Sequence, residues 1–167
     1  KGDAFLGWPI NARDMVVLAS LWMLREIEVA FARVSDVELS KCGKFVTWLL
    51  PVSKTDPQAL GKKRTLGCTC GGKPGVPCGN CLMRSHIKSL NERFSSRGGT
   101  VSDSAPLFPT CHVNPVTKQV VVKVIEFFAS KLDLALTNEV GGRAFGGHSF
   151  RVSGARWMAG LGIAISL

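Results

Sequence analysis

Basic residues of three chemical types are spread along the chain at positions where they could act on a phosphate. They are Arg25, Lys54, His148 and Arg151. Two guanidinium groups can bind the non-bridging oxygens of one phosphodiester and stabilise the charge that develops during displacement. An imidazole can exchange a proton near neutral pH, and a lysine ammonium can protonate a departing hydroxyl. Together these residue types predict phosphoryl transfer that needs no metal ion or other cofactor for its chemistry.

The most specific of these signals is the stretch "GGHSFRVSGARW", residues 146–157. His148 and Arg151 would project together from the start of a helix, where the positive end of the helix dipole also attracts an anion. Arg25 lies in an apolar segment, with Glu28 three residues later. Because a buried guanidinium is costly without an anion, we expect Arg25 either to pair with Glu28 at a helix rim or to hold a phosphate in a cleft.

Four of the six cysteines form a second motif, "CTCGGKPGVPCGNC", in a Cys-rich insertion over residues 67–86. Four thiolates can close a tetrahedral zinc site, and the glycines between them permit tight turns. The predicted ligands are Cys68, Cys70, Cys78 and Cys81. His86 is an alternative ligand, and the competing interpretation is four reduced cysteines on a loop. We expect the zinc to be structural, fixing a hairpin to the next helix and presenting Lys73 and Arg84 to DNA.

The composition favours an anionic partner. Lys and Arg total 21 against 12 Asp and Glu, a formal net charge of +9, so double-stranded DNA is the first candidate. A hydrophobic fraction of 46% supports a packed core, and no apolar run is long enough to span a bilayer. The clustered cysteines indicate a reducing, intracellular compartment, nuclear if the source is eukaryotic. The first residues are too polar for a secretory signal and lack an initial Met, so we expect a piece of a longer protein.

Hydrophobic periodicity predicts an α+β domain that is mainly helical. Helices are expected at residues 12–32, 80–95, 117–135 and 149–160. Thr117 is a predicted N-cap, although the β-branched run 120–124 leaves a strand as an alternative there. Residues 34–66 predict a small antiparallel sheet whose hairpin carries Lys54 near its bend. In the last helix we expect an inward face formed by Phe150, Gly154, Trp157 and Leu161.

In this order the motifs resemble the catalytic domain of the tyrosine recombinase (phage integrase) superfamily, including integrase-like proteins of eukaryotic mobile elements. The segment "LREIEVAFARVSDV" is similar to the family's first arginine motif, with Arg25 and Glu28 in R-x-x-E. "VSKTD" resembles the hairpin of the family lysine, which maps to Lys54, with Lys62 and Lys63 as alternatives on the same hairpin.

Two further stretches carry the resemblance. "GGHSFRVSGARWMAGLGI" resembles the family's H-x-x-R box and maps its histidine to His148 and its second arginine to Arg151. "PLFP" at 106–109 is like the short segment before the family's middle helices. The Cys-rich insertion is not required by the family hairpin, so it resembles a lineage-specific addition.

The resemblance implies a single, partial recombinase-like catalytic domain over residues 1–167. It implies site-specific recombination or integration of double-stranded DNA through a 3′-phosphotyrosyl intermediate, with the full-length protein assembling as a homo-oligomer on DNA. The chain contains no tyrosine. We therefore expect a fragment that does not cleave DNA covalently by itself, since the nucleophile would lie beyond Leu167.

Two other functions stay open at this point. One is a non-enzymatic, zinc-containing nucleic-acid-binding module derived from a recombinase, which keeps the phosphate contacts and lacks the chemistry. The other is a zinc-stabilised protein-interaction domain that binds no nucleic acid. Salt-dependent affinity for duplex DNA separates the second alternative from the other two functions.

Overall fold

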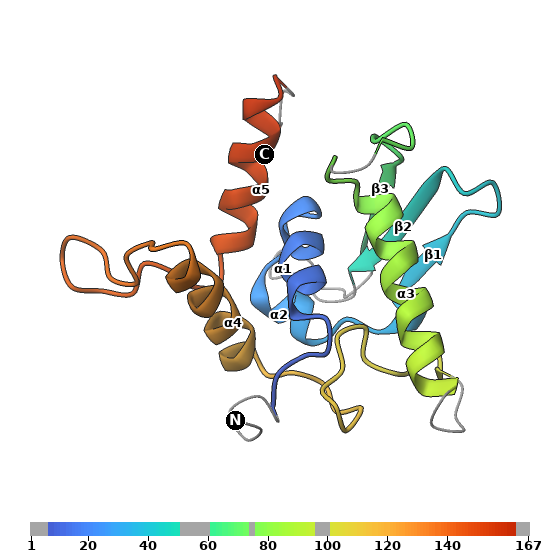
Figure 1. Ribbon diagram of the computed structural model, residues 1–167, viewed down its shortest axis with the longest axis horizontal. Coiled ribbons are helices and arrows are strands. Elements are labelled where there is room, and N and C mark those ends of the chain that lie inside the picture. Colours follow the sequence, from blue (N-terminus) through green and yellow to red (C-terminus); the bar gives the residue numbers. More distant parts are fainter. Residues whose placement is uncertain (1–6, 51–60, 74–75, 96–100, 163–167) are drawn as a thin grey trace.

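The structure, a computed structural model, describes residues 7–50, 61–73, 76–95 and 101–162. Within these ranges the α-helices are α1 (Ala12–Leu21), α2 (Glu26–Ala30), α3 (Gly79–Ser95), α4 (Lys118–Lys131) and α5 (Ser149–Gly160). The strands β1 (Val37–Leu39), β2 (Phe45–Leu50) and β3 (Lys62–Gly67) form one antiparallel sheet in the order β1-β2-β3. The predicted α+β class is confirmed. Helices α1 and α2 lie at the centre, between α4 and α5 on one side and α3 with the sheet on the other (Figure 1).

The helix predicted over 12–32 is in fact two helices. Met23 has a φ of 51°, so the chain leaves the helical conformation after α1. The amide of Met23 donates to the carbonyl of Ser20 (3.0 Å), and the amide of Leu24 donates to that of Ala19 (2.9 Å). This is the hydrogen-bond pattern of a Schellman motif, which usually has glycine where Met23 lies. Continuous apolar periodicity therefore hid a tight turn, and Arg25 begins α2 instead of lying inside one long helix.

The sheet buries one face of β2. Val46, Trp48 and Leu50 alternate with more exposed residues and belong to the main hydrophobic core. Opposite them, β3 pairs with β2 so that Arg64 lies across from Trp48. The prediction of an antiparallel hairpin between residues 34 and 66 is therefore confirmed for its strands, whereas the bend that contains Lys54 lies outside the described residues.

Helix α4 resolves the alternative between helix and strand in favour of a helix. The Thr117 hydroxyl accepts a hydrogen bond from the Val120 amide (3.3 Å), as expected for an N-cap. Val121 and Val124 are fully buried and pack in the core against α1 and α2. Tertiary packing of an apolar helix face thus overrides the β preference of the branched side chains.

Helix α5 lies against α1 through a glycine. A side chain at Gly154 would collide with the backbone carbonyl of Ser20, which belongs to α1. Phe150, one turn earlier, is buried in the core. The expected inward face stops there, because Trp157 is 36% exposed and Leu161 is 58% exposed. The close approach of the two backbones brings the first turn of α5 over the turn between α1 and α2.

None of the described helices combines the length and the apolar character that a bilayer crossing needs.

Gly154→Ala tests the close contact between α5 and α1. The added methyl group meets backbone and not a flexible side chain, so we expect the free energy of unfolding to fall by about 2 kcal/mol. Gly160→Ala is the matched control, because no atom lies within 4 Å of a Cβ at that position of the same helix. This control should gain about 0.5 kcal/mol from helix propensity. Urea unfolding measures both variants, and equal stabilities would contradict the packing.

Candidate functional site

The candidate site is built around a buried carboxylate, that of Glu28 in α2. Glu28 is 4% exposed. One carboxylate oxygen accepts a hydrogen bond from the backbone amide of Arg25 (2.7 Å), and the other lies 3.5 Å from Nη2 of Arg151. A buried carboxylate is stable only where hydrogen bonds and cations replace water. Glu28 therefore joins the start of α2 to the first turn of α5.

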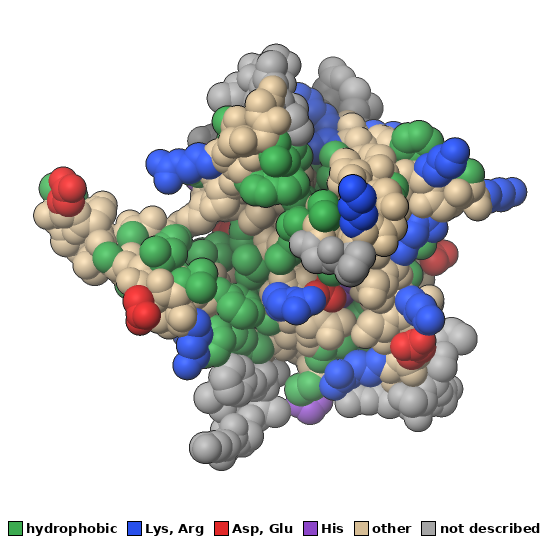
Figure 2. All heavy atoms as spheres, turned by 45° about the horizontal axis from the view of Figure 1, so that its top comes forward, with side chains coloured by type: hydrophobic (Ala, Val, Ile, Leu, Met, Phe, Trp, Pro, Cys, Tyr) green, Lys and Arg blue, Asp and Glu red, His purple; other side chains and the backbone are tan. Residues whose placement is uncertain are grey.

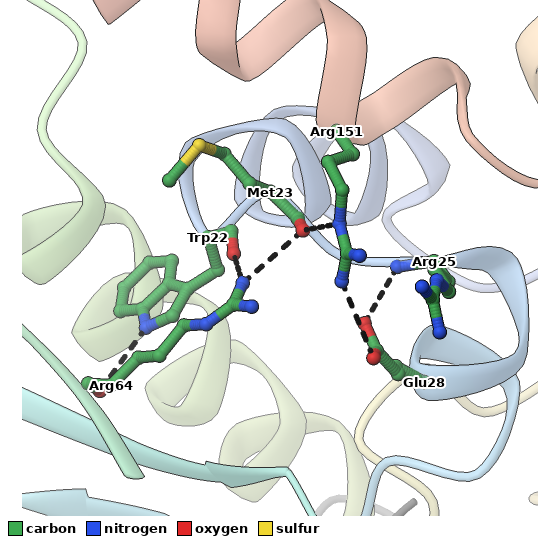
Figure 3. A network of polar contacts seen from close by, with 6 residues as sticks. All are labelled: Trp22, Met23, Arg25, Glu28, Arg64 and Arg151. Carbon is green, nitrogen blue, oxygen red and sulfur yellow. Dashed lines mark hydrogen bonds and ion pairs between the residues drawn. The ribbon is translucent and has the colours of Figure 1, made fainter. Parts of the chain in front are cut away.

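The two arginines predicted to bind one phosphate do come together. Arg151 extends from α5 toward Glu28, and its Nε donates to the carbonyl of Met23 at 3.0 Å (Figure 3). Arg25 uses its backbone amide for Glu28, while its side-chain Nε is buried without a hydrogen-bond partner in the described structure. The sequence offered two interpretations of Arg25, a side-chain pair with Glu28 or a phosphate ligand. The observed contact with Glu28 is made by the main chain and not by the side chain. Its buried donor is consistent with a site for an additional acceptor.

A third arginine, Arg64 of β3, belongs to the same cluster and was missed from the sequence. Its Nη1 donates to the carbonyls of Trp22 and, at 3.2 Å, of Met23. Burial lowers the pKa of Arg64, Glu28 raises it, and the positive charges of Arg151 and Arg25 lower it further. Arg151 thus contacts the Glu28 carboxylate with its guanidinium, Arg25 contacts it through its main chain, and Arg64 shares the Met23 carbonyl with Arg151 (Figure 3).

Arg64 was missed because it follows two lysines, Lys62 and Lys63, in what reads as a solvent-exposed strand. Both lysines are exposed, whereas Arg64 is half-buried. A signal was available in the register, because the residue opposite Arg64 is Trp48, which lies on the buried face of β2. Strand alternation would have placed Arg64 toward the core once that pairing was known.

Of the other two predicted catalytic residues, only His148 can be placed, and it is not joined to this cluster. His148 immediately precedes α5 and is exposed, and its imidazole makes no hydrogen bond or ion pair within the described part of the chain. It lines a hollow of about 430 Å³ together with Phe145, Val152 and Arg156. Lys54 lies outside the described residues. Two glycines precede His148. A side chain at Gly146 would meet no other atom within 4 Å, whereas a side chain at Gly147 would meet the carboxylate of Glu26 in α2.

The four predicted metal ligands form a cluster at the end of β3 and the start of α3. Their Sγ atoms all lie within 4.8 Å of one another, in the group Cys68, Cys70, Cys78 and Cys81. The Sγ–Sγ distances are 3.6 Å from Cys70 to both Cys68 and Cys81, 3.8 Å from Cys68 to Cys81 and 3.9 Å from Cys68 to Cys78. Tetrahedral zinc with Zn–S bonds of about 2.3 Å needs sulfur atoms about 3.8 Å apart. The cysteines therefore have the spacing of a metal centre, and these four thiols are not paired as disulfides.

Backbone donors support thiolate character in this cluster. Burial raises the pKa of the Cys78 thiol, but amide groups of Cys81, Thr69 and Cys70 outweigh burial and bring it down to about 6. Hydrogen bonds that the protonated Cys81 thiol donates to the sulfur atoms of Cys70, Cys78 and Cys68 raise the pKa of Cys81 to about 12. A bound cation would stabilise all four thiolates together, which protein groups alone do not achieve here.

His86, the alternative ligand, lies elsewhere. Its side chain is fully buried, its Nε2 contacts the Leu107 carbonyl (2.8 Å), and its Nδ1 is 3.7 Å from a carboxylate oxygen of Asp14. The expectation that Arg84 faces DNA is also wrong. Arg84 donates to the carbonyls of Ser40 (2.8 Å) and Phe45 (3.0 Å), so it holds the turn between β1 and β2. The exposed Lys73 stays available to solvent.

Comparison with known proteins adds no assignment. No family model matches the chain, and no curated protein matches it either. The functional argument therefore depends on the geometry of the arginine cluster and of the four cysteines.

Glu28→Gln tests the central role of the carboxylate. The substitution keeps the shape of the side chain but leaves the guanidinium of Arg151 without its anion. We expect the free energy of unfolding to fall by about 2 kcal/mol, less than for a fully buried pair, because the Arg151 side chain keeps 26% exposure. Glu92→Gln removes an exposed i,i+4 partner of Lys88 and should cost less than about 0.5 kcal/mol. Equal losses in urea unfolding would contradict the assignment.

Proposed function

We propose that the chain is the DNA-binding part of a recombinase-like catalytic domain, in which Arg25 and Arg151 bind a phosphodiester of double-stranded DNA. The observation that carries the proposal is that Arg25 before α2, Arg64 of β3 and Arg151 of α5 belong to one network around the Met23 turn and the buried Glu28 carboxylate. These segments are far apart in the sequence. A structural ion pair needs one guanidinium for one carboxylate, so the additional arginines favour a second anion.

The donors available to that anion come from different elements. The Nη2–Glu28 contact of Arg151 is long at 3.5 Å, and the Nε of Arg25 has no partner among the described residues. Arg151 also lies in the first turn of the 12-residue helix α5, whose N-terminal end favours negative charge. A phosphodiester presents two non-bridging oxygens that can accept from both arginines.

Long-range attraction to DNA would come from the rest of the surface. Figure 2 shows Lys and Arg side chains spread over the visible face and not gathered in one patch. With a net charge of +9, this distribution favours non-specific approach to a polyanion. The arginine cluster would then fix one phosphate in a defined place.

The resemblance suggests what the bound phosphate would undergo. In recombination, the two arginines would stabilise negative charge on the phosphate, His148 would exchange a proton and Lys54 would protonate the leaving hydroxyl. The sequence contains no tyrosine, so this chain is expected to bind the phosphate without forming a phosphotyrosyl link. A second candidate function, a non-enzymatic zinc-containing nucleic-acid-binding module, is favoured by the four-cysteine cluster.

For the cluster itself, we propose zinc in a structural role. Four thiolates at tetrahedral spacing suit Zn²⁺, and a centre with four protein ligands leaves no open position for substrate. Cys68 follows β3 directly, and Cys78 directly precedes α3. The ion would therefore hold the end of the sheet against the start of the helix.

Duplex binding at several salt concentrations tests the phosphate site. Arg25→Ala and Arg151→Ala should each weaken binding and reduce the slope of log affinity against log salt by about 1, as for one lost phosphate contact. Lys88→Ala removes one exposed charge on α3 and should leave the slope nearly unchanged. Fluorescence anisotropy with a labelled duplex measures these values. Salt titrations of both arginine variants that match the unsubstituted chain would contradict the proposal.

Metal analysis tests the cysteine site. The protein purified after expression in zinc-supplemented medium should contain one zinc ion per polypeptide. Cys78→Ser should reduce this zinc content several-fold. Cys42→Ser is the control, because Cys42 is an exposed cysteine outside the cluster. Native mass spectrometry of the intact protein gives the identity of the bound metal and the number of ions per polypeptide. Bound iron would show that the site holds a metal other than zinc, and metal-free protein would contradict the proposed metal site.

A further inference from the structure

The four-cysteine cluster and the arginine cluster share strand β3. Arg64 lies within this strand, and Cys68 comes directly after its end. The amide of Cys68 donates to the carbonyl of Lys44 at 2.8 Å, so the strand stays attached to the β1–β2 turn where the cluster begins. A ligand that fixes Cys68 therefore also fixes the end of the strand that carries Arg64.

Trp22 connects the two clusters through its side chain. A Cβ at Gly79 would lie 2.8 Å from Cζ3 of Trp22 and 3.0 Å from Cδ1 of Leu66, so the indole is in contact with both segments. Leu66 is two residues before Cys68, and Gly79 directly follows Cys78. The two halves of the cysteine motif thus continue into the two segments that pack against the indole of Trp22, which is only 1% exposed.

Arg64 then holds the backbone next to that ring. Its Nη1 donates to the carbonyls of Trp22 and Met23, and the indole Nε1 of Trp22 donates to the carbonyl of Arg64 at 3.5 Å. The carbonyl of Met23 also accepts from Nε of Arg151 (3.0 Å). One peptide oxygen is therefore shared by Arg64 and Arg151, two residues before Arg25 (Figure 3).

We propose that Arg64 is a positioning residue for the phosphate site, and that metal bound by the four cysteines holds it in position. This inference rests on the proposed phosphate-binding function. Arg64 fixes the carbonyls of Trp22 and Met23 in the left-handed turn. The Met23 carbonyl orients Arg151 through a hydrogen bond, and the backbone of the turn orients Arg25, two residues later. Because the turn has a residue with positive φ and no glycine, it depends on such external hydrogen bonds.

The first experiment follows Arg151 in zinc-loaded protein without DNA. The ¹⁵N–¹H resonance of its Nε reports the hydrogen bond to Met23, and Arg151→Lys assigns it. In Arg64→Met, with one zinc still bound, this resonance should shift and exchange faster with water. Arg64→Lys keeps a cationic donor, so its Arg151 resonance should lie between those of Arg64→Met and the unsubstituted protein. Lys88→Ala should leave the resonance unchanged. An unchanged Arg151 resonance in Arg64→Met would overturn the positioning role.

The second experiment measures the coupling between zinc and a labelled DNA duplex at fixed salt. Removing zinc with a chelator should weaken duplex binding about tenfold, within the usual range of coupling between two sites, and the duplex should raise zinc affinity by the same factor. In Arg64→Met the effect of zinc should fall to less than about twofold. Circular dichroism establishes whether the zinc-free chain is folded. If the zinc-free chain is unfolded, both variants are loaded with Cd²⁺ instead. Duplex affinity is then compared between Cd²⁺-loaded Arg64→Met and Cd²⁺-loaded Arg64→Lys, and Arg64→Met is expected to bind more weakly.

The outcomes separate this inference from the proposed function. Equal duplex affinity of folded protein with and without zinc would overturn the coupling and leave the phosphate site standing. Equal duplex affinity of the two Cd²⁺-loaded variants would overturn the positioning role of Arg64 and also leave the phosphate site standing. No duplex binding by the zinc-loaded chain would overturn the proposed function. The Arg151 resonance would then still decide whether Arg64 positions that side chain, since its measurement needs no DNA.

Discussion

A buried carboxylate that must be both ion-paired and hydrogen-bonded is the constraint on which the rest of the structure depends. Glu28 lies in a five-residue helix, too short to be stable by itself, yet it is almost fully excluded from water. Its charge can persist there only because the main chain of Arg25 and the guanidinium of Arg151 replace the lost hydration. Helix α5 and the start of α2 are accordingly held in one arrangement, and the Met23 carbonyl gives Arg151 a second fixed contact.

Backbone proximity makes this arrangement possible. Gly154 lets α5 approach α1, because a side chain there would collide with the backbone carbonyl of Ser20. The turn at Met23 then exposes carbonyl oxygens toward α5 and β3 at the point where a continuous helix would have used them internally. Two guanidinium groups satisfy these oxygens, so the break between α1 and α2 is itself part of the site. An isolated helical peptide of the same sequence would not contain these contacts.

The four-cysteine cluster adds a local constraint at the opposite side of α1. Its thiols lie at the spacing of tetrahedral metal ligands, and its two halves flank the packing partners of Trp22. The core there is continuous from Trp22 to Trp48, whose rings are 5.7 Å apart. A small sheet with only one strand buried by alternation has little packing of its own, so an ion bound by the four cysteines would add a constraint that the sheet lacks.

The sequence by itself determined the α+β class, the three later helical regions in outline, the N-cap at Thr117 and the membership of the cysteine cluster, because each depends on residues close together in the chain. It also predicted that Arg25 and Arg151 serve one site, and the structure places both in contact with Glu28, Arg25 through its main chain. Only the tertiary structure decided that Arg64 joins them, that His86 lies in the core, and that the first helix divides at Met23. These features depend on the strand register opposite Trp48 and on carbonyls met by side chains more than forty residues away, as with Arg64 and Trp22. Local patterns contain no information about such partners, since the partner is specified only when the chain has folded.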